Sequence, residues 1–224
     1  MPYLSERQQR LVTDAVEAAE ATTSGEIVTV FADRSDGYSD VVFAYAAALA
    51  FTAMSVFAAL PQPFLGLWDS LLGLWGHVWS TGEIASMTVA LGLLAFTLAW
   101  LLLSNDRVRF LSIPGPLKTA RVHHAAVRHF KVGAERRTHG RTGVLIYLSM
   151  REHRAEIFAD ESIAIKVPAE IWGDAMADML VEIRRGRIAE GIAAGVRDVG
   201  AILAEHFPRA ADDTNELPDR LIQL

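Results

Sequence analysis

Five charged or titratable side chains stand where the order of the predicted elements would bring them together. The apolar runs Gly143–Ser149 and Ala155–Ala159 are separated by a short polar turn, which predicts an antiparallel hairpin. Residues just before the first run therefore lie beside residues just after the second. If the apolar run Glu26–Ala32 is parallel to Gly143–Ser149, its start reaches the same sheet edge. The candidate site that this topology predicts consists of Glu26, His139, Arg141, Asp160 and Glu161.

A mixed cluster of this kind suits two classes of ligand. The guanidinium of Arg141 can bind a phosphorylated ligand through paired hydrogen bonds. The carboxylates of Asp160 and Glu161 can bind a cation such as calcium. The alternative is that these residues are solvated loop charges forming ordinary ion pairs, which contribute little to stability. The sequence leaves both interpretations open.

Several other chemistries are excluded. The chain has no cysteine, so it has neither disulfides nor thiolate nucleophiles nor thiolate metal ligands. His124 and His129 are five residues apart and do not share a helix face as a metal pair would, and no metal site is predicted. The sequence has no phosphate-binding loop, no dinucleotide glycine fingerprint and no HExxH motif. We expect no cofactor, with calcium as the one candidate.

The elements that must position the site belong to an α/β fold. Besides the three strands, helical spacing of apolar residues predicts helices around Leu11–Ala19, over Leu117–Phe130, Ala169–Arg185 and Ile188–His206. The first two strands are apolar on both faces, as is typical of strands buried on both sides. They are joined by a long crossover, which predicts that they are parallel. The formal net charge of −6 argues against nucleic-acid binding, which needs a basic face.

Two uncharged apolar runs, Val41–Leu60 and Ile84–Leu103, interrupt this α/β pattern. Twenty helical residues extend about 30 Å, the thickness of the hydrocarbon core of a bilayer. The runs therefore predict a transmembrane hairpin, with a pair of buried core helices as the alternative. Neither run contains an ionisable residue, so the hairpin is expected to be an anchor rather than a transport path.

The residues that flank the runs predict the orientation of the hairpin. The loop at residues 61–83 carries Trp68, Trp75 and Trp79, and we interpret it as an interfacial loop with a short helix; a ligand cage is the alternative. Arg107 and Arg109 follow the second run at the membrane interface, whereas the loop has no Lys or Arg. We expect the protein in the cell (inner) membrane. The positive-inside rule then places the loop outside and both termini in the cytoplasm.

These patterns divide the chain into four parts. Residues 1–40 and 104–207 form the two halves of one α/β domain, and residues 41–103 form the hairpin between them. Residues 208–224 are acidic, have few large apolar side chains, and are expected to be a mobile tail.

Three segments outside the hairpin resemble the TPM-domain family. They are Thr23–Phe31, Thr142–Ser149 continued by Arg154–Ala159, and Arg184–Gly191. More narrowly, the chain looks like the bacterial membrane proteins whose TPM domain is interrupted by two spans. The resemblance implies a small three-layer α/β/α sandwich, in agreement with the element order.

The resemblance implies two different kinds of function. Some family members are described as acid phosphatases or calcium binders, and others as accessory proteins in the assembly or repair of membrane complexes. Enzymatic members commonly carry an acidic residue and a glycine before the second strand, where this chain has His139-Gly140-Arg141, and a glycine-rich loop after the third, where it has Asp160-Glu161-Ser162. We therefore expect a non-enzymatic accessory or scaffold protein whose partners are the lipid bilayer and a candidate second membrane protein. A membrane-tethered phosphatase or calcium-binding domain is the alternative.

Overall fold

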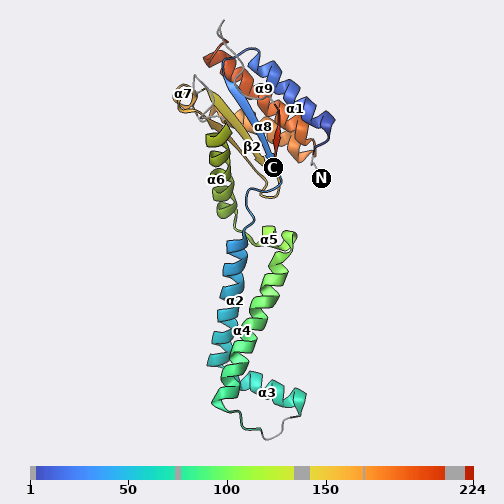
Figure 1. Cartoon of the computed structure of the whole chain (residues 1–224), viewed down its shortest axis with the longest axis vertical. Coiled ribbons are helices and arrows are strands. Elements are labelled where there is room, and N and C mark those ends of the chain that lie inside the picture. Colours follow the sequence, from blue (N-terminus) through green and yellow to red (C-terminus); the bar gives the residue numbers. More distant parts are fainter. Residues whose placement is uncertain (1–3, 74–76, 134–141, 169, 210–219) are drawn as a thin grey trace. The chain divides into compact units, whose positions relative to one another are not determined.

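The chain folds into two compact units, and the second is a continuous insert in the first (Figure 1). Residues 1–36 and 115–224 form the α/β unit, and residues 37–114 form the helical unit. The computed structural model describes residues 4–73, 77–133, 142–168, 170–209 and 220–224.

The α/β unit is built on a four-stranded sheet with the order β3-β2-β1-β4. Strand β1 (Glu26–Ala32) pairs in parallel with β2 (Gly143–Ser149), and β3 (Arg154–Ala159) pairs with β2 in the antiparallel direction. Both predicted pairings are therefore confirmed. The reason is topological, because a tight turn joins β2 to β3, whereas the whole helical unit and a crossover helix separate β1 from β2.

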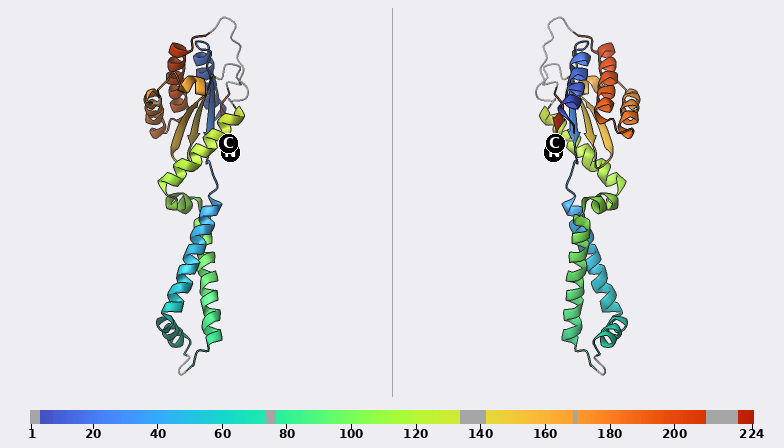
Figure 2. Two further views of the ribbon diagram at one scale, coloured as in Figure 1. Left: turned by 90° about the vertical axis from the view of Figure 1, so that its left-hand side faces the viewer. Right: turned by 90° about the vertical axis from the view of Figure 1, so that its right-hand side faces the viewer.

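Helices cover both faces of this sheet, as Figure 2 shows. On one face α1 (Glu6–Glu20), α8 (Ile171–Arg184) and α9 (Ile188–His206) share a core with alternate residues of β1 and β2. On the other face α6 (Gly115–Gly133) packs Val122, Ala126 and Phe130 against the remaining alternate residues. All seven positions of β1 and of β2 are buried, which explains their continuous apolar sequences. The predicted α/β/α sandwich is confirmed.

The end of the chain departs from the prediction of a mobile tail. Ile222 and Gln223 form β4, which pairs in parallel with β1 at Val30 and Phe31. Leu221 is buried in the core beneath α1 and α9. The backbone groups on the open edge of β1 can form hydrogen bonds with a strand of only two residues. A strand this short shows no periodic pattern in the sequence. A second unpredicted element, α7 (Glu161–Ala164), follows β3 directly.

The packing of α9 against α8 brings two acidic side chains toward each other. Burial raises the pKa of Asp198 on α9, and the negative charge of Asp178 on α8 raises it further, while Arg197 opposes both. A carboxyl group whose pKa is raised by folding destabilises the folded state above its unfolded pKa, because its ionised form is disfavoured there.

We therefore expect Asp198→Asn to increase the free energy of unfolding at pH 7 by up to about 1 kcal/mol, since the group is partly solvated. The gain should shrink as the pH falls below about 4, where the wild-type carboxyl is neutral in both states. Urea unfolding of the purified protein at the two pH values measures it. Asp174→Asn, at an exposed position of α8, should leave stability within about 0.5 kcal/mol of the wild type. A loss of stability for Asp198→Asn at pH 7 would contradict the assignment.

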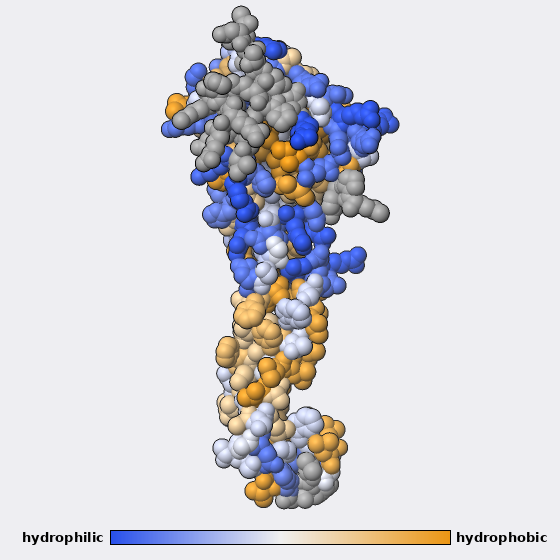
Figure 3. All heavy atoms as spheres, viewed as in Figure 1, coloured by the Kyte–Doolittle hydropathy of each residue, from blue (hydrophilic) through white to orange (hydrophobic). Residues whose placement is uncertain are grey.

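The helical unit contains two long apolar helices, α2 (Ser39–Ala59) and α4 (Thr81–Ser104). By length and composition both are able to cross a membrane, with mean hydropathies of 2.0 and 2.1. Their central stretches expose large apolar side chains, and Figure 3 shows the hydrophobic surface that results. A core helix of a soluble protein would instead bury most of its apolar residues. The short helices α3 (Pro61–Leu72) and α5 (Asp106–Ser112) complete the unit.

Small residues let α2 and α4 approach each other closely. Ala46 and Ala50 on α2 and Gly92 on α4 are buried in the contact. A Cβ atom on Gly92 would lie 2.5 Å from Sδ of Met54, so the glycine leaves room for that side chain. Phe43 and Phe96 add an edge-to-face ring contact at 5.5 Å. Close packing of small residues is the usual way in which helices associate in a bilayer.

Candidate functional site

The structure places three of the five predicted site residues at the amino end of β1 and β2. Glu26 begins β1 and lies opposite Gly143, the first residue of β2. Asp160 follows β3 and accepts a hydrogen bond from the backbone N–H of Gly143 at 2.9 Å. Glu161 is exposed as the first residue of α7. His139 and Arg141 lie outside the described residues.

The carboxylates at this end hold the backbone in place. Asp160 and Gly143 also form a backbone hydrogen bond of 2.9 Å, so the aspartate closes the end of the β2–β3 ladder with both its main chain and its side chain. In the same region Glu20 of α1 accepts a hydrogen bond from the N–H of Ile27 at 2.7 Å. Carboxylates that accept backbone N–H groups stabilise strand ends, and this role needs no ligand.

The predicted membrane-interface residues lie in the helical unit. Trp68 is exposed on α3, and the indole N–H of Trp79 donates to Asp69 at 3.1 Å; Trp75 lies outside the described residues. Arg107 is exposed on α5, whereas Arg109 is half-buried, donates to the carbonyl of Gly37 at 2.9 Å and forms an ion pair with Asp106. The sequence did not single out Leu111, which is 87% exposed on the same short helix.

A second polar cluster, which the sequence did not predict, occupies the carboxyl end of the parallel strands. Its members are Ser35, Tyr147, Ser149 and Glu152, and we call it the serine–glutamate network. Ser35 follows β1, Tyr147 and Ser149 belong to β2, and Glu152 lies in the turn between β2 and β3. Tyr147, Ser149 and Glu152 are only 1%, 0% and 2% exposed.

The carboxylate of Glu152 determines which hydroxyl donates in each hydrogen bond of this network. An ionised carboxylate only accepts hydrogen bonds, so the short contact between Ser149 and Glu152 is donated by the serine hydroxyl. Each hydroxyl has one proton, so Ser35 must donate to Oγ of Ser149 at 3.0 Å. Tyr147 must then donate to Oγ of Ser35, also at 3.0 Å. The three hydroxyls form one directed chain that ends on Glu152.

Electrostatics support this direction. Burial raises the pKa of the Tyr147 phenol, and the negative charge of Glu152 raises it further, while the hydrogen bond with Ser35 opposes them. The phenol therefore stays protonated and able to donate. The ring of His129 on α6 stacks on Tyr147 at 5.8 Å. Burial lowers the pKa of His129, and the neighbouring charge of Arg128 lowers it further, so this histidine is neutral at pH 7.

The network also fixes the segment that leads from β1 into the helical unit. The second carboxylate oxygen of Glu152 accepts the backbone N–H of Ser35 at 3.1 Å. Nε of Arg151 donates to Asp33 at 3.0 Å, and its backbone N–H donates to the carbonyl of Asp33 at 2.9 Å. Arg121 of α6 pairs with Asp36 at 3.4 Å. Residues 33–36 are thus held to the β2–β3 turn and to α6.

The hydrogen bonds of this network hold β2, the β2–β3 turn and the end of β1 together. A nucleophilic hydroxyl must reach its substrate, and the hydroxyl of Ser149 is enclosed on all sides. The sequence placed Glu152 in a polar turn, where an acidic residue is normally exposed. The signal for the network was the presence of Tyr147 and Ser149, two residues apart, on one face of an otherwise apolar strand.

Comparisons with known proteins agree with the architecture of the α/β unit. Residues 118–202 match the family model of the TPM domain, a region that starts in α6 and ends in α9. A solved structure, the NMR structure of the BA42 protein from the psychrophilic bacterium Bizionia argentinensis, aligns with a TM-score of 0.52 and 19% identity. The alignment covers 100% of this chain and 97% of BA42, and at this identity it speaks for the fold alone. Among curated protein sequences no match was found.

Proposed function

This chain carries a TPM domain, and on that premise we propose that it is an integral membrane protein whose TPM domain acts in the cytoplasm as a non-enzymatic accessory or scaffold for a membrane complex. The two apolar helices are its anchor. The proposed partners are the lipid bilayer and a second membrane protein that the TPM domain supports.

One observation carries the membrane part of this proposal. Strand β1 comes before the helical unit and β2 after it, yet the two pair along their whole length in one sheet. The segments on either side of the insert therefore lie on the same side of any membrane that the insert enters. An even number of crossings is required, and the insert supplies two helices of sufficient length, α2 and α4.

The flanking charges support a cytoplasmic TPM domain. Arg107 and Arg109 follow α4 directly, and α6 adds Lys118 and Arg121, while residues 61–83 contain no Lys or Arg. The positive-inside rule places the basic flank in the cytoplasm. The same rule puts α3 with Trp68, and Trp79 before α4, at the outer surface of the membrane.

Support for a non-enzymatic role comes from the polar groups at the two ends of the sheet. Glu152 accepts Ser35 and Ser149, and Asp160 accepts Gly143, so these carboxylates are engaged in holding strands and turns together. The hydroxyls of Tyr147 and Ser149 are buried, and that of half-buried Ser35 is engaged with both of them. A scaffold needs a well-ordered domain, and the contacts of residues 33–36 with the β2–β3 turn and with α6 hold the end of β1 within that domain.

The absence of cysteine makes the topology directly testable. We expect Val78→Cys, in the loop before α4, to react with a membrane-impermeant maleimide in intact spheroplasts. Arg10→Cys, at an exposed position of α1, should react only after the cells are lysed. The measurement is the labelled fraction of each variant on a gel, before and after lysis.

The wild-type chain is the control, because it offers no thiol to the reagent. Labelling of Arg10→Cys in intact spheroplasts would reverse the proposed orientation. Recovery of the protein in the soluble fraction would contradict the anchor itself.

A further inference from the structure

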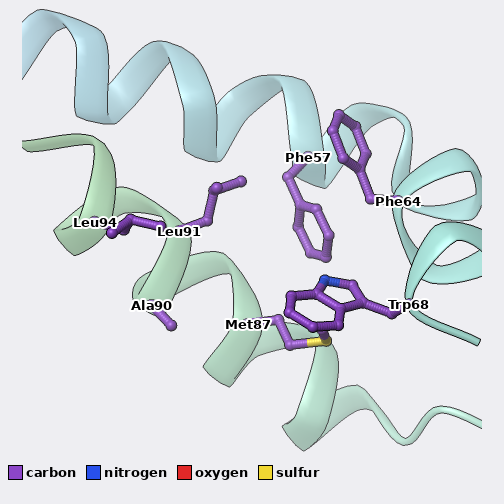
Figure 4. Close-up of a pocket in the computed structure, with 7 residues that line it drawn as sticks. All are labelled: Phe57, Phe64, Trp68, Met87, Ala90, Leu91 and Leu94. Carbon is purple, nitrogen blue, oxygen red and sulfur yellow. The ribbon is translucent and has the colours of Figure 1, made fainter. Parts of the chain in front are cut away.

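The end of the helical unit where α2, α3 and α4 meet contains an apolar pocket of about 180 Å³ (Figure 4). The pocket exists because α3 begins immediately after α2 and turns the chain aside, with Phe57 and Phe64 in ring contact at 5.6 Å. The side chains that line it are Phe57, Phe64, Trp68, Met87, Ala90, Leu91 and Leu94. Figure 4 shows that Phe57 and Trp68 face each other across it.

The lining determines what kind of group can enter. It consists of carbon and sulfur atoms apart from the indole nitrogen of Trp68, so a water molecule would find too few hydrogen-bond partners there. Apolar cavities of about 150 Å³ stay dry and accept hydrocarbon ligands of the size of benzene. An empty pocket would also forfeit the dispersion contacts of its walls. The lining therefore suits a stretch of hydrocarbon.

The position of the pocket indicates the source of that hydrocarbon. Met87 and Leu94 lie on α4, and at about 1.5 Å per residue they are roughly 9 Å and 20 Å from its first residue, Thr81. In the membrane arrangement proposed above, on which this inference rests, these positions run from the acyl chains of the outer leaflet to about the middle of the hydrocarbon core. Ala90 and Leu94 are exposed on the lipid-facing surface, so the pocket is open to the chains around it.

The charges near the pocket select among lipid headgroups. Asp69 is next to Trp68 on α3, and Glu83 is one helical turn before Met87 on α4. Residues 61–83 contain no Lys or Arg. His77 lies 3.3 Å from Glu83, and Asp69 accepts the indole N–H of Trp79 at 3.1 Å, but with histidine neutral the two carboxylates still give this segment a negative formal charge. An anionic headgroup would be repelled by this end of the hairpin, whereas a headgroup with an ammonium group would be attracted.

We propose that the pocket holds one acyl chain of a zwitterionic phospholipid whose ammonium-bearing headgroup lies beside Asp69 and Glu83. The site would hold one lipid at the outer end of the hairpin and fill the gap between α3 and α4.

Tryptophan fluorescence tests this, because bromine atoms on an acyl chain quench an indole that they touch. The full-length protein is reconstituted into vesicles of equal parts phosphatidylethanolamine and phosphatidylglycerol, with brominated chains on one lipid or the other. The contribution of Trp68 is the difference between the wild type and Trp68→Phe. We expect quenching of Trp68 to be about twofold or more stronger when the bromine is on phosphatidylethanolamine, as is reasonable for charges at a screened surface.

Two alanines of α4 provide a matched pair of variants. Ala90→Phe fills the pocket and should reduce the quenching of Trp68, whereas Ala85→Phe, exposed on α4 but outside the pocket, should leave it unchanged. The double variant Asp69→Asn, Glu83→Gln should abolish the preference between the lipids and leave the total quenching in place.

The outcomes separate this inference from the proposed function. Trp100, 48% exposed and four residues before the end of α4, reports insertion through the difference between wild type and Trp100→Phe. No quenching of Trp100 would overturn the membrane anchor itself. Quenching of Trp100 with no effect of Ala90→Phe on Trp68 would overturn the acyl-chain site alone, and equal quenching of Trp68 by both brominated lipids would overturn the choice of headgroup.

Discussion

Glu152→Ala should reduce the free energy of unfolding of the protein by about 2–4 kcal/mol, because it leaves buried donors without an acceptor. Ser35 loses the acceptor of its backbone N–H, and Ser149 loses the acceptor of its hydroxyl. The hydroxyl chain from Tyr147 then has no carboxylate at its end. The measurement is the free energy of unfolding in urea, followed by circular dichroism of the purified protein in mild detergent.

Two further variants make this result specific. In Glu152→Gln the amide oxygen can still accept from Ser35, and the amide N–H can donate to Ser149, so the loss should be below about 1.5 kcal/mol. Glu161→Ala removes an exposed acidic residue and should change stability by no more than about 0.5 kcal/mol. A loss below 1 kcal/mol for Glu152→Ala would show that the network does not hold this end of the sheet.

Replacement of residues 37–114 by a short linker should leave a folded domain that is recovered in the soluble fraction, because the proposed membrane anchor is removed. The core of the α/β unit is supplied by residues on both sides of the insert, as β1, β2 and α6 show. Asp36 and Arg121 are in contact at 3.4 Å, so the two ends of the unit lie close together. Gly115 lies about 9 Å along α6 from Arg121, and eight glycine or serine residues extend to about 26 Å.

The expected readouts are recovery of the excised protein in the soluble fraction and a single cooperative unfolding transition. A matched deletion of residues 77–104, which removes α4 but leaves α2, should stay in the membrane fraction and fail to join its two halves correctly. Insolubility of the excised protein with a linker of either eight or twelve residues would contradict the independence of the α/β unit.

An activity assay of the excised domain also distinguishes the two functions that the sequence left open, a scaffold and a membrane-tethered phosphatase. A generic phosphate ester, offered with and without calcium, should not be turned over if the TPM domain is a scaffold. Turnover that depends on calcium would instead support the membrane-tethered phosphatase. Because Asp160 also closes the β2–β3 ladder, Asp160→Asn would be informative only if its unfolding transition matched that of the parent domain.

Parts of the fold were predictable because their apolar residues follow a regular pattern over many positions. The strands β1 and β2 are continuous apolar runs, and the helices α6, α8 and α9 repeat apolar residues at helical spacing, so their existence and the directions of β1, β2 and β3 followed. Strand β4 was missed since two residues carry no period, and its partner on β1 is distant in the sequence.

The candidate site was predictable only in outline. The sheet topology correctly placed Glu26 and Asp160 at one sheet end, because strand direction alone fixes which loops are neighbours. The importance of Glu152 was not predictable from its polar turn, since its burial depends on Ser35, which is 117 positions away in the sequence. Contacts between residues so far apart are set by the tertiary fold rather than by local patterns.

The position of β1 between two later strands has a consequence for synthesis. Both of its neighbours, β2 and β4, leave the ribosome long after it, and residues 33–142 must be made before the first of them is available. At about 5–20 residues per second this takes roughly 5–20 seconds, during which an apolar strand has two unpaired edges. During this time the edges of β1 are open to pairing with a strand of another nascent protein.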